Sequence, residues 1–306
     1  MSRKIIVGSR GSKLALLQTE SVIARIREAN PHLEVSLRKI VTTGDRHTQL
    51  DRLEVAAFVK ELEQALLDGR IDLAVHSLKD VPTELPSRLC LLAVTERLDP
   101  RDALVAKARL NELAAGSTIG TGSLRRMVQL MGYRPDLRAR PIRGNVDTRL
   151  GKVSSGEFDG VIVAAAAMLR LGWQERITEY LPLEHFLPAV GQGALVVEAR
   201  VDDKDIATLV SPLTNLPAWQ GITAERAFLH AIGGGCRTPV AALGTVNGNT
   251  LRLEGMVASI SGRRVLRAAE EGSATSAGEV GMRLAEKMRG MGAAEIIAEA
   301  RRHENG

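Results

Sequence analysis

Aromatic residues are scarce in this chain, at 3% of its 306 residues. Modules that bind single-stranded nucleic acid stack bases on aromatic side chains, so this scarcity argues against such modules. Long apolar runs are also missing: no stretch approaches the roughly 20 apolar residues that span a bilayer. Arg10 and Lys13 interrupt the region where a secretory signal has its apolar core, so we expect a soluble, cytosolic protein.

Cysteine and histidine are also scarce. The two cysteines, Cys90 and Cys236, form neither a CxxC motif nor a disulfide framework. The six histidines are scattered without HxxH or HxxxH spacing. This pattern argues against a structural metal site, and we predict no metal.

Apolar residues and a moderate positive charge are what the chain does have. It is 44% hydrophobic and 25% charged, which is typical of globular proteins and not of disordered ones. The length leaves room for two or three domains. The net charge of +5 favours anionic partners: nucleic acid, a membrane surface or acidic small molecules.

The order of the predicted elements favours an α/β fold in the first part of the chain. Short strand patterns at 4–7, 33–41 and 71–75 are separated by helical patterns at 14–29 and 52–69. Strands that alternate with helices indicate a parallel sheet.

A second unit with the same pattern begins near Arg97. Residues 117–131 predict a strand, a glycine loop and a helix, and 136–142 and 160–168 predict further strands. The segment 187–200 ends in another strand.

A third region follows the proline-containing segment 211–217, which we interpret as a linker. A helix at 222–231, two strands around "SISGRR" and a long helix from about residue 276 predict a small α+β domain.

Seven arginines and no lysine lie between positions 125 and 149. Arginine binds carboxylates and phosphates through two parallel hydrogen bonds, whereas lysine acts as a mobile point charge. The cluster therefore favours a polyanionic ligand held in a fixed orientation. Ser123 is predicted to cap a helix that starts at Leu124, where free N–H groups attract anions. The alternative is ordinary surface charge, and Arg138 and Arg140 fit it because they alternate along a strand.

The stretch "AVHSLKDVP" (74–82) places polar residues after an apolar strand. In α/β sheets, ligands bind beyond the carboxyl ends of strands, so Asp80 is placed to be a buried catalytic carboxylate with Lys79 beside it. The alternative is that Asp80 caps a turn before Pro82. We interpret His76 as a structural histidine.

Cys236 lies in "IGGGCRTPV" (232–240), directly after three glycines. A free cysteine is usually a small buried hydrophobe, which is our interpretation of Cys90. The glycines leave space around the sulfur of Cys236, and Arg237 favours its thiolate form. A packing residue does not need such a backbone, whereas a cysteine that carries a bulky group does.

These features leave several classes of protein open. One is an enzyme that acts on an anionic substrate. Another is a non-catalytic binding protein with two lobes and an arginine-rich cleft. A nucleic-acid-binding protein and a cysteine acyltransferase are two more.

The chain resembles the porphobilinogen deaminase (hydroxymethylbilane synthase) family over most of residues 5–240. The matching segments occur in order, and together they are very specific. They are "GSRGSKLAL", "VTTGD", "FVKELEQALLDGRIDLAVHSLKDVPTELP", "ERLDPRDAL", "IGTGSLRRMVQL", "RPIRGNVDTRL", "LPAVGQGAL", "TAERAFL" and "GGGCRTPV".

The resemblance implies an α/β fold with two domains like periplasmic binding proteins and a smaller C-terminal α+β domain. The expected domains are residues 1–95 with 191–211, residues 96–190, and residues 217–306. It also implies a cytoplasmic monomer without nucleic-acid or membrane partners.

The resemblance further implies a transferase that joins porphobilinogen units with loss of ammonia into the linear tetrapyrrole hydroxymethylbilane. The chain is built on a dipyrromethane cofactor that is attached to Cys236 by a thioether bond. Asp80 is the implied catalytic carboxylate, which stabilises pyrrole N–H groups and the cation that forms as ammonia leaves. The acetate and propionate of every pyrrole ring explain the arginine cluster.

The family match extends to individual binding residues. The implied cofactor-binding residues, besides Cys236, are Lys79, Thr121, Ser123, Arg125, Arg126 and Arg149. The implied substrate-binding residues are Arg10, Ser12, Gln18, Phe58, Arg143, Arg149, Arg170 and Gln192.

Two departures from the family pattern stand out. The segment 46–57 has neither the glycine nor the lysine usual in the family's mobile stretch, so we expect a stiffer lid, with Arg46 or Arg52 replacing the lysine. Gly122 stands where serine is common, which removes one hydroxyl contact.

Overall fold

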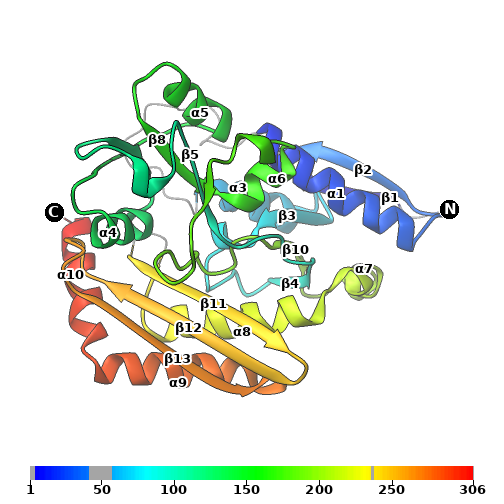
Figure 1. The fold of residues 1–306 in the computed structure, drawn as a ribbon. Helices are drawn as coiled ribbons and strands as arrows, with labels where there is room; N and C mark the ends of the chain where they lie inside the picture. Colours follow the sequence, from blue (N-terminus) through cyan, green and yellow to red (C-terminus); the bar gives the residue numbers. More distant parts are fainter. Residues whose placement is uncertain (1–3, 41–56, 236–237, 306) are drawn as a thin grey trace. The chain divides into compact units, whose positions relative to one another are not determined.

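The computed structural model describes residues 4–40, 57–235 and 238–305, and the chain forms two compact units (Figure 1). The first unit comprises Met1–Leu98 and Ala194–Trp219. The second comprises Asp99–Gly193 and Gln220–Gly306. The chain therefore leaves the first unit, forms part of the second, returns, and leaves again.

The first unit is built on a five-stranded sheet with the order β2-β1-β3-β10-β4. Its strands are β1 (Lys4–Ser9), β2 (Glu34–Lys39), β3 (Leu73–Ser77), β4 (Leu89–Val94) and β10 (Leu195–Arg200). β1, β2 and β3 are parallel, as predicted, but β10 runs antiparallel to both β3 and β4. β10 joins this sheet when the chain returns from the second unit.

Among the described residues, α1 (Lys13–Ala29), α3 (Ala57–Leu67) and α7 (Lys204–Val210) lie within this unit. α1 begins where Ser12 Oγ accepts a hydrogen bond from the backbone N–H of Ala15 at 3.3 Å, and it ends at Asn30, just before Pro31. Its buried face, including Val22 and Ile26, joins the sheet's core.

The second unit contains a sheet with the order β7-β6-β8-β5-β9. Its strands are β5 (Asp102–Ala106), β6 (Thr118–Gly120), β7 (Arg138–Arg140), β8 (Gly160–Ala164) and β9 (Glu179–Tyr180). Here too a single strand, β5, runs antiparallel to its neighbours. Both sheets therefore have the same arrangement of strand directions.

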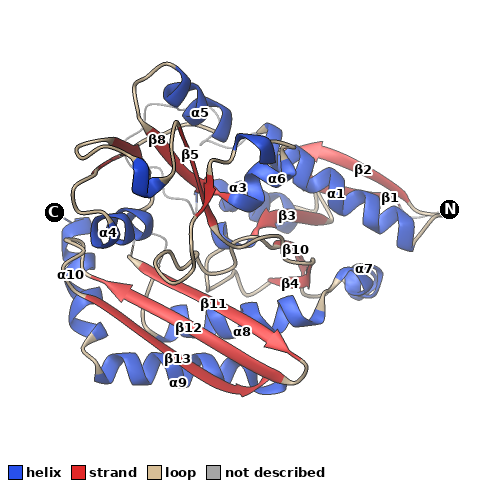
Figure 2. Ribbon diagram, in the orientation of Figure 1, coloured by secondary structure: helices blue, strands red, loops and turns tan. Residues whose placement is uncertain are grey.

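The helices α4 (Leu124–Tyr133), α5 (Val146–Ser154) and α6 (Ala165–Arg170) accompany this sheet (Figure 2). The predicted strand at 160–168 is too long, because β8 ends at Ala164 and α6 follows at once. The alanines after position 164 favour a helix over a strand.

A three-stranded antiparallel sheet completes the second unit. Its strands are β11 (Val240–Asn247), β12 (Thr250–Ala258) and β13 (Val265–Ser273). It packs with α8 (Leu216–Ala231), α9 (Ala277–Gly290) and α10 (Ala293–Asn305) around a buried apolar core. A second buried cluster joins Val128 of α4 and Leu187 to Met256 of this sheet.

The segment 211–217 contains a 3₁₀ turn at Ser211–Leu213 and the start of α8, and its interpretation as a linker stays a prediction. The long helix predicted from about residue 276 is two helices. The break falls at Gly292, whose φ of 93° is a conformation that favours glycine.

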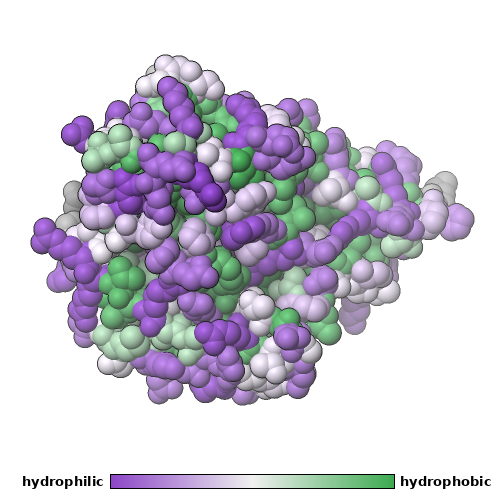
Figure 3. All heavy atoms as spheres, viewed as in Figure 1, coloured by the Kyte–Doolittle hydropathy of each residue, from purple (hydrophilic) through white to green (hydrophobic). Residues whose placement is uncertain are grey.

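The predicted fold class is confirmed: an α/β protein with two such sheets and a smaller C-terminal sheet with helices. The division into three domains stays a prediction. None of the described helices is long and apolar enough to cross a membrane. The face in Figure 3 is largely hydrophilic, and the exposed large apolar side chains, such as Val201, Val265 and Met282, come from different elements.

Candidate active site

In the first unit, the predicted site residues follow two neighbouring parallel strands. Arg10 and Ser12 follow β1, and Lys79 and Asp80 form a 3₁₀ turn (Leu78–Asp80) directly after β3. Since β1 pairs with β3 in parallel, all four residues belong to the same edge of the sheet. This is the edge where α/β proteins bind ligands.

A buried amide ties α1 to this edge. Gln18 is 6% exposed, and its Nε2 donates a hydrogen bond to Ser77 Oγ at 2.9 Å. Ser77 is the last residue of β3, so the bond holds the helix against the strand that leads to Lys79 and Asp80. In the structure Gln18 thus supports the position of the turn.

Asp80 is half-buried rather than buried as predicted. Among the described residues, no hydrogen bond or ion pair engages its carboxylate. His76, in contrast, is buried, and its Nε2 lies 2.9 Å from Oε2 of the buried Glu198. The prediction of a structural histidine is confirmed.

The second unit has its own set of polar residues at the carboxyl ends of parallel strands. Thr121 and Ser123 follow β6, Arg143 follows β7, and Arg170 ends the helix that follows β8. Thr121 is buried, and its Oγ1 accepts a hydrogen bond from the N–H of Ser123 at 3.1 Å. Ser123 caps α4 as predicted, with its Oγ accepting a bond from the N–H of Arg126 at 3.5 Å.

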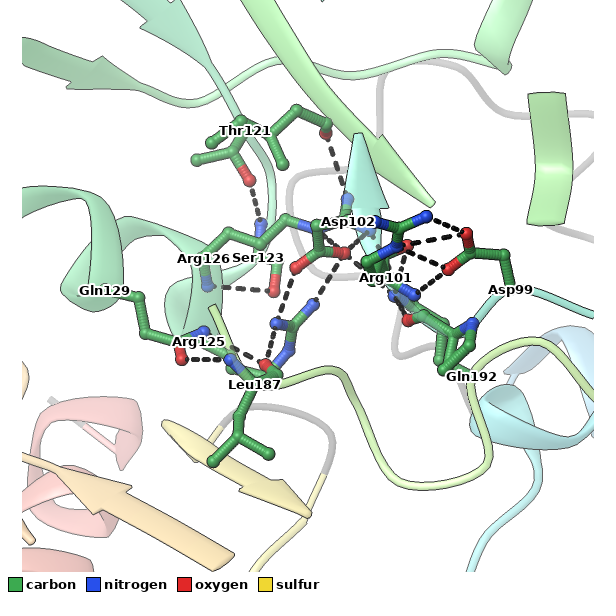
Figure 4. Close-up of polar contacts among 12 residues, drawn as sticks. Asp99, Arg101, Asp102, Thr121, Ser123, Arg125, Arg126, Gln129, Leu187 and Gln192 are labelled. Carbon is green, nitrogen blue, oxygen red and sulfur yellow. Dashed lines mark hydrogen bonds and ion pairs between the residues drawn. The ribbon is translucent and has the colours of Figure 1, made fainter. Parts of the chain in front are cut away.

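Arg125 and Arg126, in the first turn of α4, both bind one carboxylate, that of Asp102 (Figure 4). Arg125 Nη1 donates to Oδ2 at 2.7 Å, and Arg126 Nε and Nη2 donate to Oδ1 at 2.9 and 2.8 Å. Asp102 is fully buried, and the arginines are 4% and 5% exposed. Figure 4 shows both guanidinium groups turned toward this carboxylate.

Backbone carbonyls and an amide complete the cluster. Arg125 also donates to the carbonyl of Leu187, and Arg126 donates to that of Ile162. Gln192 is 1% exposed, and its Nε2 donates to Asp102 Oδ1 at 2.8 Å. The structure therefore places Gln192 inside the protein, beside the cluster.

The charges of this cluster do not balance. Burial alone would raise the pKa of Asp102, but Arg125 and Arg126 outweigh it and hold this pKa well below its usual range. One carboxylate thus faces two guanidinium groups, and one positive charge remains without a counterion among these three side chains. A buried excess charge of this kind favours a bound anion.

Arg149 adds to the positive character of the site. Burial, and to a smaller extent the charge of Arg126, lower its pKa to about 10. Burial also lowers the pKa of Arg170 to about 10, while its Nη2 donates to the carbonyl of Gly193 at 2.7 Å. Both side chains remain cationic at neutral pH.

The other predicted arginines are outside this cluster. Arg138 and Arg140 are exposed on β7, as expected of surface charge, and Arg143 is exposed after it. Arg134 pairs with Asp136 at the far end of α4. Gly122 has little free space, since a Cβ there would lie 3.0 Å from the carbonyl oxygen of Ile142.

Several predicted residues lie outside the described part of the chain. These are Cys236, Arg237 and the segment 46–56, with Arg46 and Arg52; of Phe58 only the backbone in α3 is described. The two residues that flank positions 236 and 237 are held together. Gly235 N donates to Thr238 Oγ1 at 2.7 Å, and this hydroxyl donates to Gly235 O at 2.8 Å.

Asp102 is the buried carboxylate of this cluster that sequence reasoning missed. It stands at the start of the apolar strand β5, where a lone carboxylate needs a counterion. Because β5 runs antiparallel, its first residue pairs with Ala164 at the carboxyl end of β8. The signal was therefore a charged residue at a strand start, but only the strand direction shows where it lies.

Comparison with known proteins identifies the family. Residues 5–208 match the family model described as "Porphobilinogen deaminase, dipyromethane cofactor binding domain". Residues 219–290 match the model of the porphobilinogen deaminase C-terminal domain. The chain belongs to the porphobilinogen deaminase family.

Curated relatives agree with this assignment over nearly the whole chain. The porphobilinogen deaminase of Bacillus subtilis is 45% identical over 309 residues, covering 99% of this chain and 98% of the relative. That of Syntrophus aciditrophicus is 45% identical over 287 residues, covering 92% and 94%. The predictions of a porphobilinogen deaminase and a transferase are confirmed.

Solved structures align more weakly. The BvgS VFT2 domain of Bordetella pertussis, a double mutant, is 13% identical with a TM-score of 0.43, covering 68% of this chain and 85% of that one. A TRAP periplasmic solute-binding protein of Pseudomonas putida is 11% identical with a TM-score of 0.41, covering 74% and 81%. The family assignment rests on the sequence matches.

Proposed function

We propose that this porphobilinogen deaminase joins porphobilinogen units, with loss of ammonia, into the linear tetrapyrrole hydroxymethylbilane. Growth starts from a dipyrromethane cofactor attached to Cys236 by a thioether bond. The observation that carries the proposal is the match of residues 5–208 to the cofactor-binding domain of the family, because this range includes Asp80 and the whole arginine cluster.

The residues of the second unit suit a cofactor that carries carboxylates. The excess positive charge of Arg125 and Arg126, with Arg149 beside them, requires an anion. Thr121 and Ser123 add hydroxyl groups at the same strand end. These residues, with Lys79, would hold the cofactor's acetate and propionate groups, and the bound cofactor supplies the pyrrole carbon to which new units are added.

Asp80 is the proposed catalytic residue. Loss of ammonia leaves a positive charge on the substrate, and a carboxylate near this charge lowers the energy of the transition state. Asp80 is half-buried, where a charge interacts more strongly than in water, and its carboxylate is not occupied by another described residue.

The proposed substrate contacts lie at the strand ends of both units. Cationic side chains would bind the carboxylates of porphobilinogen and of the growing chain. The proposed residues are Arg10, Ser12, Gln18, Phe58, Arg143, Arg149, Arg170 and Gln192. We also propose three domains, a monomeric state and a cytoplasmic location, with porphobilinogen as the only small-molecule partner.

Replacing Asp80 tests the proposal directly. We expect Asp80→Ala to lower kcat for ammonia release from porphobilinogen by about 10²- to 10⁴-fold. Asp68→Asn, which removes an exposed carboxylate of the same unit, is the control and keeps kcat within about twofold. If Asp80→Ala kept more than about a tenth of the wild-type kcat, Asp80 would not have the role proposed.

A further inference from the structure

Among the described residues, Asp102 is the acidic side chain that both Arg125 and Arg126 bind, and its two oxygens accept five hydrogen bonds from three side chains. Its Oδ1 accepts bonds from Arg126 Nε, Arg126 Nη2, Gln192 Nε2 and, at 3.2 Å, Arg125 Nη2. Its Oδ2 accepts one from Arg125 Nη1. Removing it would leave both arginines without their shared counterion.

The place of the two arginines is unfavourable without this carboxylate. They are adjacent in sequence, and their like charges repel each other in a buried site. They also occupy the first turn of α4, where the helix dipole disfavours positive charge. Asp102 therefore supplies the attraction that keeps both guanidinium groups at this strand end.

Asp102 also determines which N–H groups remain for a ligand. With Leu187 and Ile162, it takes up one side of each guanidinium group. Among the described residues, Arg125 Nε, one N–H of Arg125 Nη2 and one N–H of Arg126 Nη1 have no acceptor once these bonds are made. A carboxylate bound at these groups meets donors whose direction is already set, which lowers the entropic cost of binding.

We propose that Asp102 is a positioning residue of the active site, which holds Arg125 and Arg126 in the geometry that binds the cofactor's carboxylates. The inference rests on the proposed role of these two arginines. Asp102 itself does not touch the cofactor in this account. It acts through the guanidinium groups.

Two simpler roles for Asp102 make different predictions. If Asp102 only competes with the cofactor for the arginines, its removal would raise the positive charge and strengthen cofactor binding. If it only stabilises the fold, its removal would lower the thermal stability and leave cofactor attachment to the folded chain unchanged.

Two variants of the full-length chain separate these views. In Arg125→Gln, Asp102 remains and still holds Arg126, so the side chains at positions 102, 125 and 126 together carry no net charge. In Arg125→Gln/Asp102→Asn, these three side chains regain the wild-type net charge, but Arg126 has lost its carboxylate partner. The wild type and Asp136→Asn, which breaks the Arg134–Asp136 pair of the same helix, are the references.

The measurement is the rate at which each chain, produced in cells that make no porphobilinogen, gains the cofactor mass when porphobilinogen is added. Thermal unfolding of each chain gives its folded fraction, and rates are expressed per folded chain. We expect the double variant to react about 10- to 100-fold more slowly than Arg125→Gln, because misplaced binding groups cost this much. The KM of the loaded double variant should also exceed that of Arg125→Gln.

The other outcomes are distinct. Equal rates per folded chain, or a faster double variant, would overturn the positioning role of Asp102. If Arg125→Gln and Arg126→Gln both gained the cofactor at the wild-type rate, this result would contradict the proposed role of the two arginines, and with it the positioning role of Asp102. Asp136→Asn should match the wild type in either case.

Discussion

At the scale of single residues, the structure divides the seven arginines that the sequence places between 125 and 149. Arg125 and Arg126 are buried, Arg149 is half-buried with its charge close enough to that of Arg126 to lower its pKa, and Arg138 and Arg140 are exposed. The sequence predicts the residue types but not this division. The division depends on Asp102, which comes from a strand that enters the sheet in the reverse direction.

Glu63 is a second buried carboxylate, in a less favourable environment. It lies on α3 and is 9% exposed. Burial raises its pKa, and the charge of Glu198 raises it further, while His76 opposes the shift. The folded state therefore holds the Glu63 proton more tightly than the unfolded state does. This contribution to stability is present at low pH and is lost as the pH rises through the folded pKa.

We expect Glu63→Gln to increase the free energy of unfolding at pH 7 by on the order of 1 kcal/mol, because it removes an ionised group from a buried site. The difference from the wild type should shrink as the pH falls below about 4, where the carboxyl group becomes protonated in both states. Chemical denaturation at several pH values measures it. Glu20→Gln, at an exposed position of α1, should show no such trend. A Glu63→Gln chain that is less stable at pH 7 would contradict the account.

At the scale of elements, close contact between helices depends on glycine. Gly281 of α9 faces α8, where a Cβ at position 281 would lie 2.3 Å from the carbonyl oxygen of Ala224 and 2.9 Å from the N–H nitrogen of Phe228. These atoms belong to the backbone of a buried helix. They cannot move without shifting the core of the C-terminal sheet.

Gly281→Ala should therefore lower the free energy of unfolding by about 2–4 kcal/mol through overpacking. Gly278→Ala lies one turn earlier in the same helix, where an added Cβ meets nothing within 4 Å. This control should gain up to about 1 kcal/mol from helix propensity. Thermal unfolding compares the two variants. Equal effects would mean that α8 and α9 do not pack as closely as described.

Sequence patterns predict most elements well where propensity and periodicity agree. The helix after Ser123 begins at its capping serine as expected, and the predicted helix at 14–29 is present as α1. Errors occur where one composition suits two structures, as in 160–168, where an apolar run continues from strand into helix. These patterns do not predict strand direction, because the direction depends on how the chain connects distant segments.

At the scale of the whole molecule, the two five-stranded sheets share one topology. In each, three parallel strands are followed by one reversed strand and a fifth strand. The reversed strands, β10 and β5, are those that the chain reaches after passing from one unit to the other. The sequence suggests the repeat through its strand, glycine loop and helix pattern, without visible internal similarity.

Only part of the candidate site can be predicted from the sequence. Motif resemblance predicts Asp80, Arg125 and Arg126 by position, and the strand ends explain why these residues share the ligand-binding edges of their sheets. Asp102, and the inward position of Gln192, require the three-dimensional structure. A buried counterion has no sequence pattern of its own, since any acidic residue brought near by the fold can serve.

The central claim is that Cys236 carries a dipyrromethane made from two porphobilinogen units. The most direct test is the intact mass of the acid-denatured chain, followed by peptide mapping around Cys236. The account predicts an excess mass of two porphobilinogen units less their ammonia, located on Cys236, or gained there when a bare chain is incubated with porphobilinogen. A thiol at Cys236 that stays unmodified after this incubation would contradict the account.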